Sequence, residues 1–261
     1  MQLRCRLLRP AKVLTLLACL ALSGWVRGET LVIAADRWCP INCEPGSERP
    51  GIFVELARDI FAEAGIEVRY EMRNWARVLQ EVRRGEINAA IGAGIGDAPD
   101  FLFTETPVAM SRNCFYTLPD SSWRYDGLAS LAEVRLGVIN DYSYGVEINA
   151  YVAAHHRHVD QVQVAAGDKA LDINLSKLGH RRIDAMIENS WVVQARLAEL
   201  GRSGELREAG CREPDVPIYL AFSPALKASS RHVQLFEQGL LRYRANGRLQ
   251  ALLKAYGVER H

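Results

Sequence analysis

Short apolar runs alternate with amphipathic helical segments along most of this chain, and this alternation constrains the fold more than any other feature. An apolar, β-branched run at 30–35 precedes apolar residues at helical spacing over 52–65. The pair then repeats as a strand at 66–72 and a helix at 75–84, and a third buried strand follows at 87–91. Strands that alternate with helices predict βαβ units and a mostly parallel sheet.

The alternation begins again further along the chain. The expected strands and helices of this second series lie at 113–118, 134–139, 145–156, 162–165, 169–178, 183–187, 190–200, 218–223, 230–244 and 248–256. We therefore expect an α/β protein of two lobes, each a mostly parallel sheet flanked by helices. Residues 29–112 begin lobe 1, residues 113–216 form lobe 2, and residues 217–261 return to lobe 1, so that two strands connect the lobes.

Residues 1–28 have the pattern of a secretory signal peptide. Four basic residues precede an apolar run at 13–22, and small residues follow it. The run is shorter than the about 20 residues that a membrane span needs. We expect cleavage after Gly28 and a periplasmic location. The alternative is a lipid anchor at Cys19, because residues 16–19 loosely resemble a lipobox, but Leu17 and the continuing apolar stretch disfavour it.

The charge balance disfavours nucleic acid and membrane surfaces as partners. Residues 1–28 carry five basic and no acidic side chains, so the remainder has 27 basic and 31 acidic residues and a formal charge of −4. Such a chain has no basic surplus that would attract polyanions.

Four cysteines remain after the signal peptide: Cys39, Cys43, Cys114 and Cys211. An even number in an oxidising compartment predicts two disulfides, for which three connectivities exist. Cys39 and Cys43 lie in one short loop, so a local bridge costs little chain entropy, and Cys114 is left with Cys211 by elimination alone. Metal or redox chemistry is the alternative, but Cys-x3-Cys is not the redox spacing, and a metal site would need all four thiolates to converge.

Several blocks of sequence, taken in order, resemble the periplasmic solute-binding proteins of family 3, the receptors for polar amino acids in ABC importers. These blocks are LVIAADRWCP at 31–40, GIFVELARDIF at 51–61, GEINAAI at 85–91, FTETP at 103–107, LGVI at 136–139, IDAMI at 183–187 and ANGRLQALLKAYG at 245–257. The resemblance implies the type II periplasmic-binding-protein fold, with two α/β lobes, a two-strand hinge and a ligand held in the cleft. It also implies a monomer that docks on a membrane permease and needs no cofactor.

The residues that should contact the ligand depart from the family pattern. Members that bind amino acids carry an Arg about six residues before the block at 103–107, and its guanidinium holds the ligand carboxylate. Here that position is Asp97, and the family's Asp that meets the α-amino group falls at Asn189, beside Glu188. An ordinary zwitterionic amino acid is therefore a poor match for this cleft.

Candidate ligand-binding residues follow the predicted strands, where parallel-sheet proteins place their ligands. The turn at 141–145 matches the family's anion-holding turn in position and presents backbone N–H groups before a helix. Each candidate also has a plain structural interpretation: the tryptophans as core, the glycines as a flexible turn and Asp97 as a helix cap. The candidates are Trp38, Trp75, Gly92, Ala93, Gly94, Asp97, Ser143, Tyr144, Gly145, Glu188 and Asn189.

Other charged or metal-binding residue types carry weaker hypotheses. Arg112 lies in the expected hinge, where a solvated side chain is the simplest interpretation. His155, His156 and His158 resemble a metal cluster but have no carboxylate or cysteine partner at a convincing spacing, so we expect a solvated helix end and no metal. The familiar hydrolase, metalloprotease and P-loop motifs are absent from the sequence.

The sequence thus predicts a non-enzymatic binding protein that captures a small polar solute, amino-acid-like or amine-bearing, for an ABC importer. One alternative keeps the fold but delivers the ligand signal to a membrane sensor. A second is a periplasmic cyclohexadienyl-type dehydratase with Glu188 as the acid, which the missing Arg disfavours because those substrates are anionic.

Overall fold

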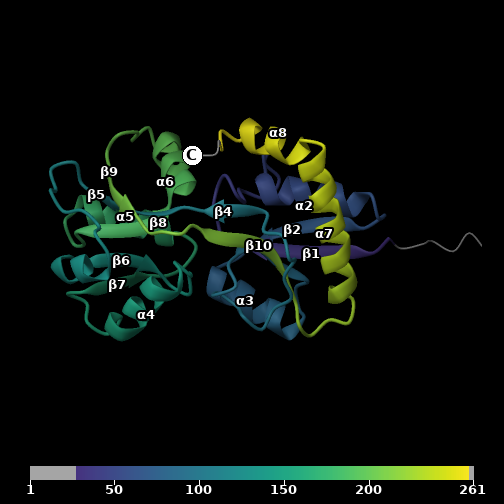
Figure 1. The fold of residues 1–261 in the computed structure, drawn as a ribbon, viewed down its shortest axis with the longest axis horizontal. Coiled ribbons are helices and arrows are strands. Elements are labelled where there is room, and N and C mark those ends of the chain that lie inside the picture. The colour runs from purple at the N-terminus through teal and green to yellow at the C-terminus, as the bar shows by residue number, and fades with distance from the viewer. Residues whose placement is uncertain (1–27, 259–261) are drawn as a thin grey trace, which may run out of the picture.

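The computed structural model describes residues 28–258, which form two five-stranded sheets with flanking helices (Figure 1). We call the sheet whose strands lie within residues 30–111 and 216–222, with its helices, lobe 1, and the sheet whose strands lie within residues 113–211, with its helices, lobe 2. The predicted signal peptide up to residue 27, Cys19 included, lies outside the described residues. The two-lobed α/β fold predicted from the alternation is confirmed.

The sheet of lobe 1 has the strand order β2-β1-β3-β10-β4. β1 (Thr30–Ala35) pairs in parallel with β2 (Glu67–Met72) and β3 (Ala89–Ala93). β10 (Val216–Phe222) runs antiparallel to β3 and to β4 (Ala109–Ser111). The inner strands are almost wholly apolar because helices cover both faces of the sheet.

One face of this sheet is covered by α2 (Ile52–Ala62), α7 (Ser229–Ala245) and α8 (Arg248–Ala255), whose apolar residues share one buried core with the strands. The other face is covered by α3 (Trp75–Arg84), which lies on the opposite side of the strands in Figure 1. α3 ends at Arg84, the end predicted from the sequence, because the following Gly85 adopts the left-handed conformation with φ 76°.

The sheet of lobe 2 has the strand order β7-β6-β8-β5-β9. β6 (Leu136–Ile139) pairs in parallel with β7 (Val162–Ala165) and β8 (Ala185–Asn189). β5 (Asn113–Thr117) runs antiparallel to β8 and to β9 (Arg207–Cys211).

Two helical layers enclose the sheet of lobe 2. The short 3-10 helix η1 (Leu128–Glu133) and α4 (Val146–His155) contribute to the core on one face, and α5 (Ala170–Gly179) and α6 (Ser190–Glu199) to the core on the other. Lobe 2 therefore repeats the layered plan of lobe 1.

Each sheet is more mixed than the alternation of strands and helices implies, with two parallel and two antiparallel pairings. The antiparallel pairs involve the strands that lead into and out of the lobe connections. Two of these, β4 and β9, were not expected from the sequence, because β4 spans three residues and β9 (REAGC) has no apolar run.

The chain crosses between the lobes at Arg112 and again at 212–215, next to the predicted boundaries at 112 and 216. A disulfide joins Cys114 to Cys211, which face each other on β5 and β9 at the lobe 2 end of the crossings, with an S–S distance of 2.08 Å. The second disulfide links Cys39 to Cys43 with an S–S distance of 1.99 Å. These two disulfides have the connectivity favoured from the sequence: a local bridge within one loop and a second bridge between the two remaining cysteines.

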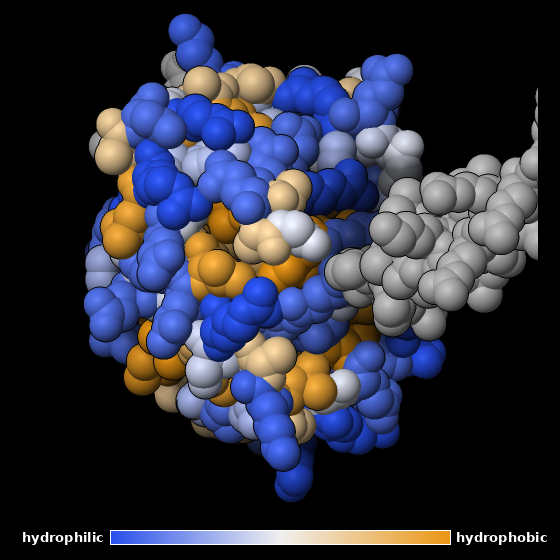
Figure 2. All heavy atoms as spheres, turned by 90° about the vertical axis from the view of Figure 1, so that its right-hand side faces the viewer, coloured by the Kyte–Doolittle hydropathy of each residue, from blue (hydrophilic) through white to orange (hydrophobic). Residues whose placement is uncertain are grey.

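The surface of lobe 1 mixes apolar with hydrophilic side chains, as Figure 2 shows for the end of the molecule opposite lobe 2. Within residues 28–258, no helix combines the length and the apolar character needed to cross a membrane.

Candidate functional site

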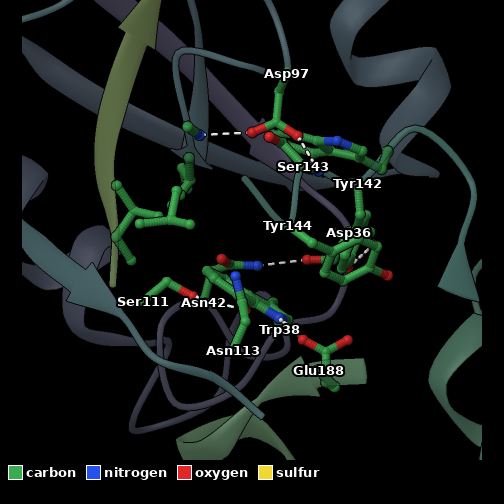
Figure 3. A pocket seen from close by; sticks show the side chains of 16 residues that line it. Asp36, Trp38, Asn42, Asp97, Ser111, Asn113, Tyr142, Ser143, Tyr144 and Glu188 are labelled. Carbon is green, nitrogen blue, oxygen red and sulfur yellow. Dashed lines mark hydrogen bonds between the residues drawn. The ribbon is translucent and has the colours of Figure 1, made fainter. Parts of the chain in front are cut away.

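A pocket of about 460 Å³, part of it open to solvent, lies between the two lobes (Figure 3). Its walls come from segments that follow β1, β3 and β6, from the end of β8, from the start of α3 and from the crossings between the lobes. The sixteen lining residues are Asp36, Trp38, Asn42, Trp75, Ile91, Gly92, Gly94, Asp97, Ser111, Asn113, Tyr142, Ser143, Tyr144, Glu188, Val216 and Ile218.

Local backbone features hold Trp38 in the pocket wall. Trp38 N–H donates to the carbonyl oxygen of Asn42 at 3.0 Å, and the Cys39–Cys43 disulfide closes the same turn. Gly92, with φ 75°, faces the Trp38 ring so closely that a Cβ at Gly92 would lie 3.2 Å from it. The glycine therefore allows the indole to pack against the end of β3.

Three acidic residues, Asp36, Asp97 and Glu188, line the pocket, and none of the sixteen lining residues is Lys, Arg or His. Figure 3 shows Asp97 and Glu188 at opposite ends of the pocket in this view. Burial raises the pKa of Asp36 to about 6 and the pKa of both Asp97 and Glu188 to about 7. Desolvation disfavours the charged carboxylate, and hydrogen bonds from nearby donors offset only part of this effect.

Buried atoms without a partner also mark this pocket. Glu188, Asn42 and Asn113 are at most 3% exposed. Glu188 Oε2, Asn42 Oδ1 and Asn113 Nδ2 have no hydrogen-bond partner within residues 28–258. Because an unpaired buried polar group costs about 1–3 kcal/mol, these atoms indicate where ligand groups would bind.

Aromatic rings form another part of the wall. The Tyr142 ring meets Trp38 at a centroid distance of 6.4 Å and Trp75 at 6.2 Å, both edge to face. Tyr144 lies 6.2 Å from Tyr142 in a tilted arrangement. Electron-rich ring faces beside carboxylates favour a cation over an anion.

Hydrogen bonds across the cleft hold the lobes together around the pocket. Tyr142 Oη of lobe 2 donates to Asp36 Oδ2 of lobe 1 at 2.6 Å. Trp38 Nε1 of lobe 1 donates to Glu188 Oε1 of lobe 2 at 2.9 Å. Asp97 Oδ1 of lobe 1 also accepts from Ser143 N–H of lobe 2 at 2.8 Å. All three pocket acids are therefore engaged by the opposite lobe, so the structure represents a closed arrangement.

Two further contacts close the cleft. Trp75 Nε1 donates to the carbonyl oxygen of Asp141 at 3.0 Å. At the edge of the cleft, Arg37 binds both carboxylate oxygens of Glu199, at 2.9 and 2.7 Å. These contacts also connect lobe 1 with lobe 2.

Eleven residues were predicted from the sequence to contact ligand, and the structure places eight of them in the pocket wall: Trp38, Trp75, Gly92, Gly94, Asp97, Ser143, Tyr144 and Glu188. Ala93, Gly145 and Asn189 do not line it. Ala93 packs in the core beside α3, and the side-chain position of Gly145 faces Arg212. Asn189 instead caps α6, where its Oδ1 accepts from Trp191 N at 2.9 Å.

Eight lining residues were missed by the sequence analysis. Asp36 and Tyr142 had a usable signal, since Asp36 follows a predicted strand two positions before Trp38 and Tyr142 lies within the predicted turn at 141–145. Asn113 and Ser111 flank a crossing between the lobes, and no local pattern marks them. The missed residues are Asp36, Asn42, Ile91, Ser111, Asn113, Tyr142, Val216 and Ile218.

The remaining sequence candidates do not line the pocket. Arg112, at the first crossing, is 3.5 Å from Glu208. His155 stacks on Tyr151 at a centroid distance of 4.2 Å. Among residues 28–258, the one group spaced to hold a metal ion is Cys114, Glu208 and Cys211, and its two sulfurs form a disulfide.

No protein-family model matches the sequence, and no curated protein matches it significantly. Solved structures match the whole fold. A histidine kinase sensor domain with similarity to periplasmic binding proteins has a TM-score of 0.74 and 18% identity, over 88% of this chain and 96% of that one. The P235GK mutant of ArgBP from T. maritima has a TM-score of 0.72 and 18% identity, over 89% and 96%.

A third structure comes from work on glutathione import through GshT and the cystine ABC importer TcyBC of Streptococcus mutans. It has a TM-score of 0.72 and 16% identity, over 88% of this chain and 95% of that one. At such identities the likeness establishes the fold and leaves the ligand open. The chain therefore has the two-lobed type II fold of the periplasmic binding proteins.

Proposed function

We propose that this protein is a periplasmic binding protein that captures a small polar, amine-bearing solute between its lobes. The observation that carries the proposal is the pocket itself, which collects three carboxyl groups and four aromatic rings without a basic residue. A protonated amine would supply the missing positive charge and would bind the ring faces and the unpartnered oxygens.

Capture rests on closure of the lobes. Pocket residues of lobe 1 bind pocket residues of lobe 2, so a ligand that contacts both lobes favours the closed form over an open one. In this proposal the closed protein then docks on the permease of an ABC importer.

A thermal-shift screen of the chain that begins at Glu29 tests the proposal. The ligands are amines, amino acids, small carboxylic acids and short peptides at pH 8. A solute at 100 times its dissociation constant stabilises the folded state by about 2.7 kcal/mol, which raises Tm by about 5–11 °C for a protein of this size. We expect shifts with amine-bearing compounds, and shifts with acids alone would contradict the proposal.

Signalling is the second candidate role, favoured by the match to a histidine kinase sensor domain. Deletion of the gene separates the two roles once the amine is known. Loss of uptake of the radiolabelled amine supports import. Retained uptake with loss of a transcriptional response to the amine supports sensing.

A cyclohexadienyl-type dehydratase remains the enzymatic alternative, with Glu188 as general acid. The raised pKa of Glu188, about 7, would keep part of the population protonated for such a role. However, an anionic substrate would meet three carboxyl groups and no basic side chain in this pocket. Incubation with prephenate tests this alternative, since steady product formation would overturn the binding proposal.

A further inference from the structure

The turn at 141–145, which the sequence marked as anion-holding, already binds an anionic group of the same chain. Ser143 N–H of lobe 2 donates to Asp97 Oδ1 at 2.8 Å, and Gly94 N–H of lobe 1 donates to Asp97 Oδ2 at 2.6 Å. Figure 3 shows the Asp97 carboxylate between these donors at one end of the pocket. One side-chain carboxylate therefore bridges backbone donors of both lobes.

The next N–H group of this turn, that of Tyr144, is engaged as well. Tyr144 N–H donates to Asn149 Oδ1 at 2.8 Å, and Asn149 Nδ2 donates to Ser143 Oγ at 2.8 Å. A carboxylate arriving with a ligand would have to displace Asp97 or Asn149 to reach these N–H groups.

The rest of the pocket gives a ligand carboxylate little compensation. None of the lining residues is basic, and Asp36 and Glu188 would repel a second anion. Among the fully buried side-chain atoms of the wall, Asn113 Nδ2 is an unpartnered donor, whereas Glu188 Oε2 and Asn42 Oδ1 are unpartnered acceptors. The free groups thus match a cation with several N–H donors and one small acceptor.

We propose that Asp97 takes the place of a ligand carboxylate, so that the pocket selects amines or guanidines that lack a carboxylate. This inference rests on the proposed function and narrows it to one class of ligand. Asp97 is then a specificity residue: it holds the lobes together as a ligand carboxylate would, and it excludes amino acids that bring their own.

Matched pairs of ligands test the inference on the unmodified protein. Each pair consists of an amino acid and its decarboxylated amine: arginine and agmatine, lysine and cadaverine, histidine and histamine. Calorimetric titration at pH 8, where Asp97 is mostly ionised, gives both dissociation constants of a pair. We expect at least tenfold tighter binding of the amine in any pair that binds.

Substitution of Asp97 tests the mechanism. Asp97→Ala frees Ser143 N–H and Gly94 N–H and leaves space for a carboxylate, so the preference for the amine should fall at least tenfold. Asp36→Asn is the matched control: it also removes a pocket charge but leaves the turn occupied. Asp36→Asn should weaken binding of the amine but should not strengthen binding of the amino acid. Circular dichroism verifies that both variants fold.

The outcomes separate the two proposals. If the unmodified protein binds amino acids as tightly as their amines, the role of Asp97 is overturned while capture of an amine-bearing solute stands. If Asp36→Asn and Asp97→Ala change the preference equally, general charge and not the turn sets selectivity, which also overturns the inference. If no member of any pair binds, both proposals fail.

Discussion

Replacing Glu188 by glutamine tests the acidic character of the pocket with little change of shape. Glu188 Oε1 accepts hydrogen bonds from Trp38 Nε1 at 2.9 Å and from Asn189 N at 2.7 Å. The amide oxygen of glutamine can accept both bonds, and its NH2 group takes the position of the unpartnered Oε2. The variant therefore removes a charge while it retains the contacts that close the cleft.

The expected change in stability follows from the pKa. Burial raises the pKa of Glu188 from 4.5 to about 7, and at about 1.4 kcal/mol per pH unit the buried charge costs about 3 kcal/mol. Because the folded-state pKa is raised, the stability that this group contributes is complete below pH 4.5 and is lost as the pH rises through about 7. Glutamine does not titrate, so Glu188→Gln should lack this loss.

Urea unfolding at pH 4.5 and pH 8, followed by tryptophan fluorescence, measures the effect. The difference in free energy of unfolding between Glu188→Gln and the unmodified protein should be about 3 kcal/mol more favourable to the variant at pH 8 than at pH 4.5. This corresponds to about 6–12 °C in Tm. Glu133→Gln is the control, since Glu133 is an exposed carboxylate at the end of η1. It should show no such difference.

Binding of the amine should change in the opposite direction. Loss of the charge partner of a buried ammonium group costs about 2 kcal/mol or more, which weakens binding about 30-fold. A variant that is more stable at pH 8 and binds more weakly would support a pocket built to receive a cation. Unchanged pH dependence together with unchanged affinity would refute the reasoning.

Three further predictions concern the pocket and the hinge. Because the pocket carboxyl groups have pKa values of about 6–7, amine binding should release protons, and the affinity should rise at least tenfold from pH 5 to pH 8. Calorimetry in two buffers measures the proton release and the affinity, and an affinity that does not change with pH contradicts the prediction. Replacing Cys114 and Cys211 by alanine removes a disulfide that spans a sequence separation of 97, so the free energy of unfolding in urea should fall by about 4 kcal/mol. A fall of less than about 1 kcal/mol would argue against this disulfide as a main constraint on the fold. Alanine at position 92 would have a strained φ of 75° and a Cβ 3.2 Å from the Trp38 ring, so Gly92→Ala should lower the affinity for the amine about fivefold or more. An unchanged affinity would show that this contact is dispensable.

The sequence was sufficient to predict the fold and much of the pocket, because both depend on local patterns. Apolar periodicity marked the helices and most strands of both lobes, and strand ends pointed to Trp38, Asp97 and Glu188. β4 and β9 escaped prediction because a three-residue strand and a polar strand have no such periodicity. The absence of an Arg in the segment before residue 103 could also be read directly from the chain.

Only the tertiary structure decided how the acidic groups combine. Asp36 and Glu188 are 152 positions apart and line one pocket because the lobes face each other. The tertiary structure also separates neighbours, since Glu188 lines the pocket while the side chain of Asn189 caps α6. Desolvation and missing partners depend on which surfaces meet when the lobes close, and local sequence patterns do not contain that information. The acidic residues were visible in the sequence. That they line one pocket without a basic side chain was not.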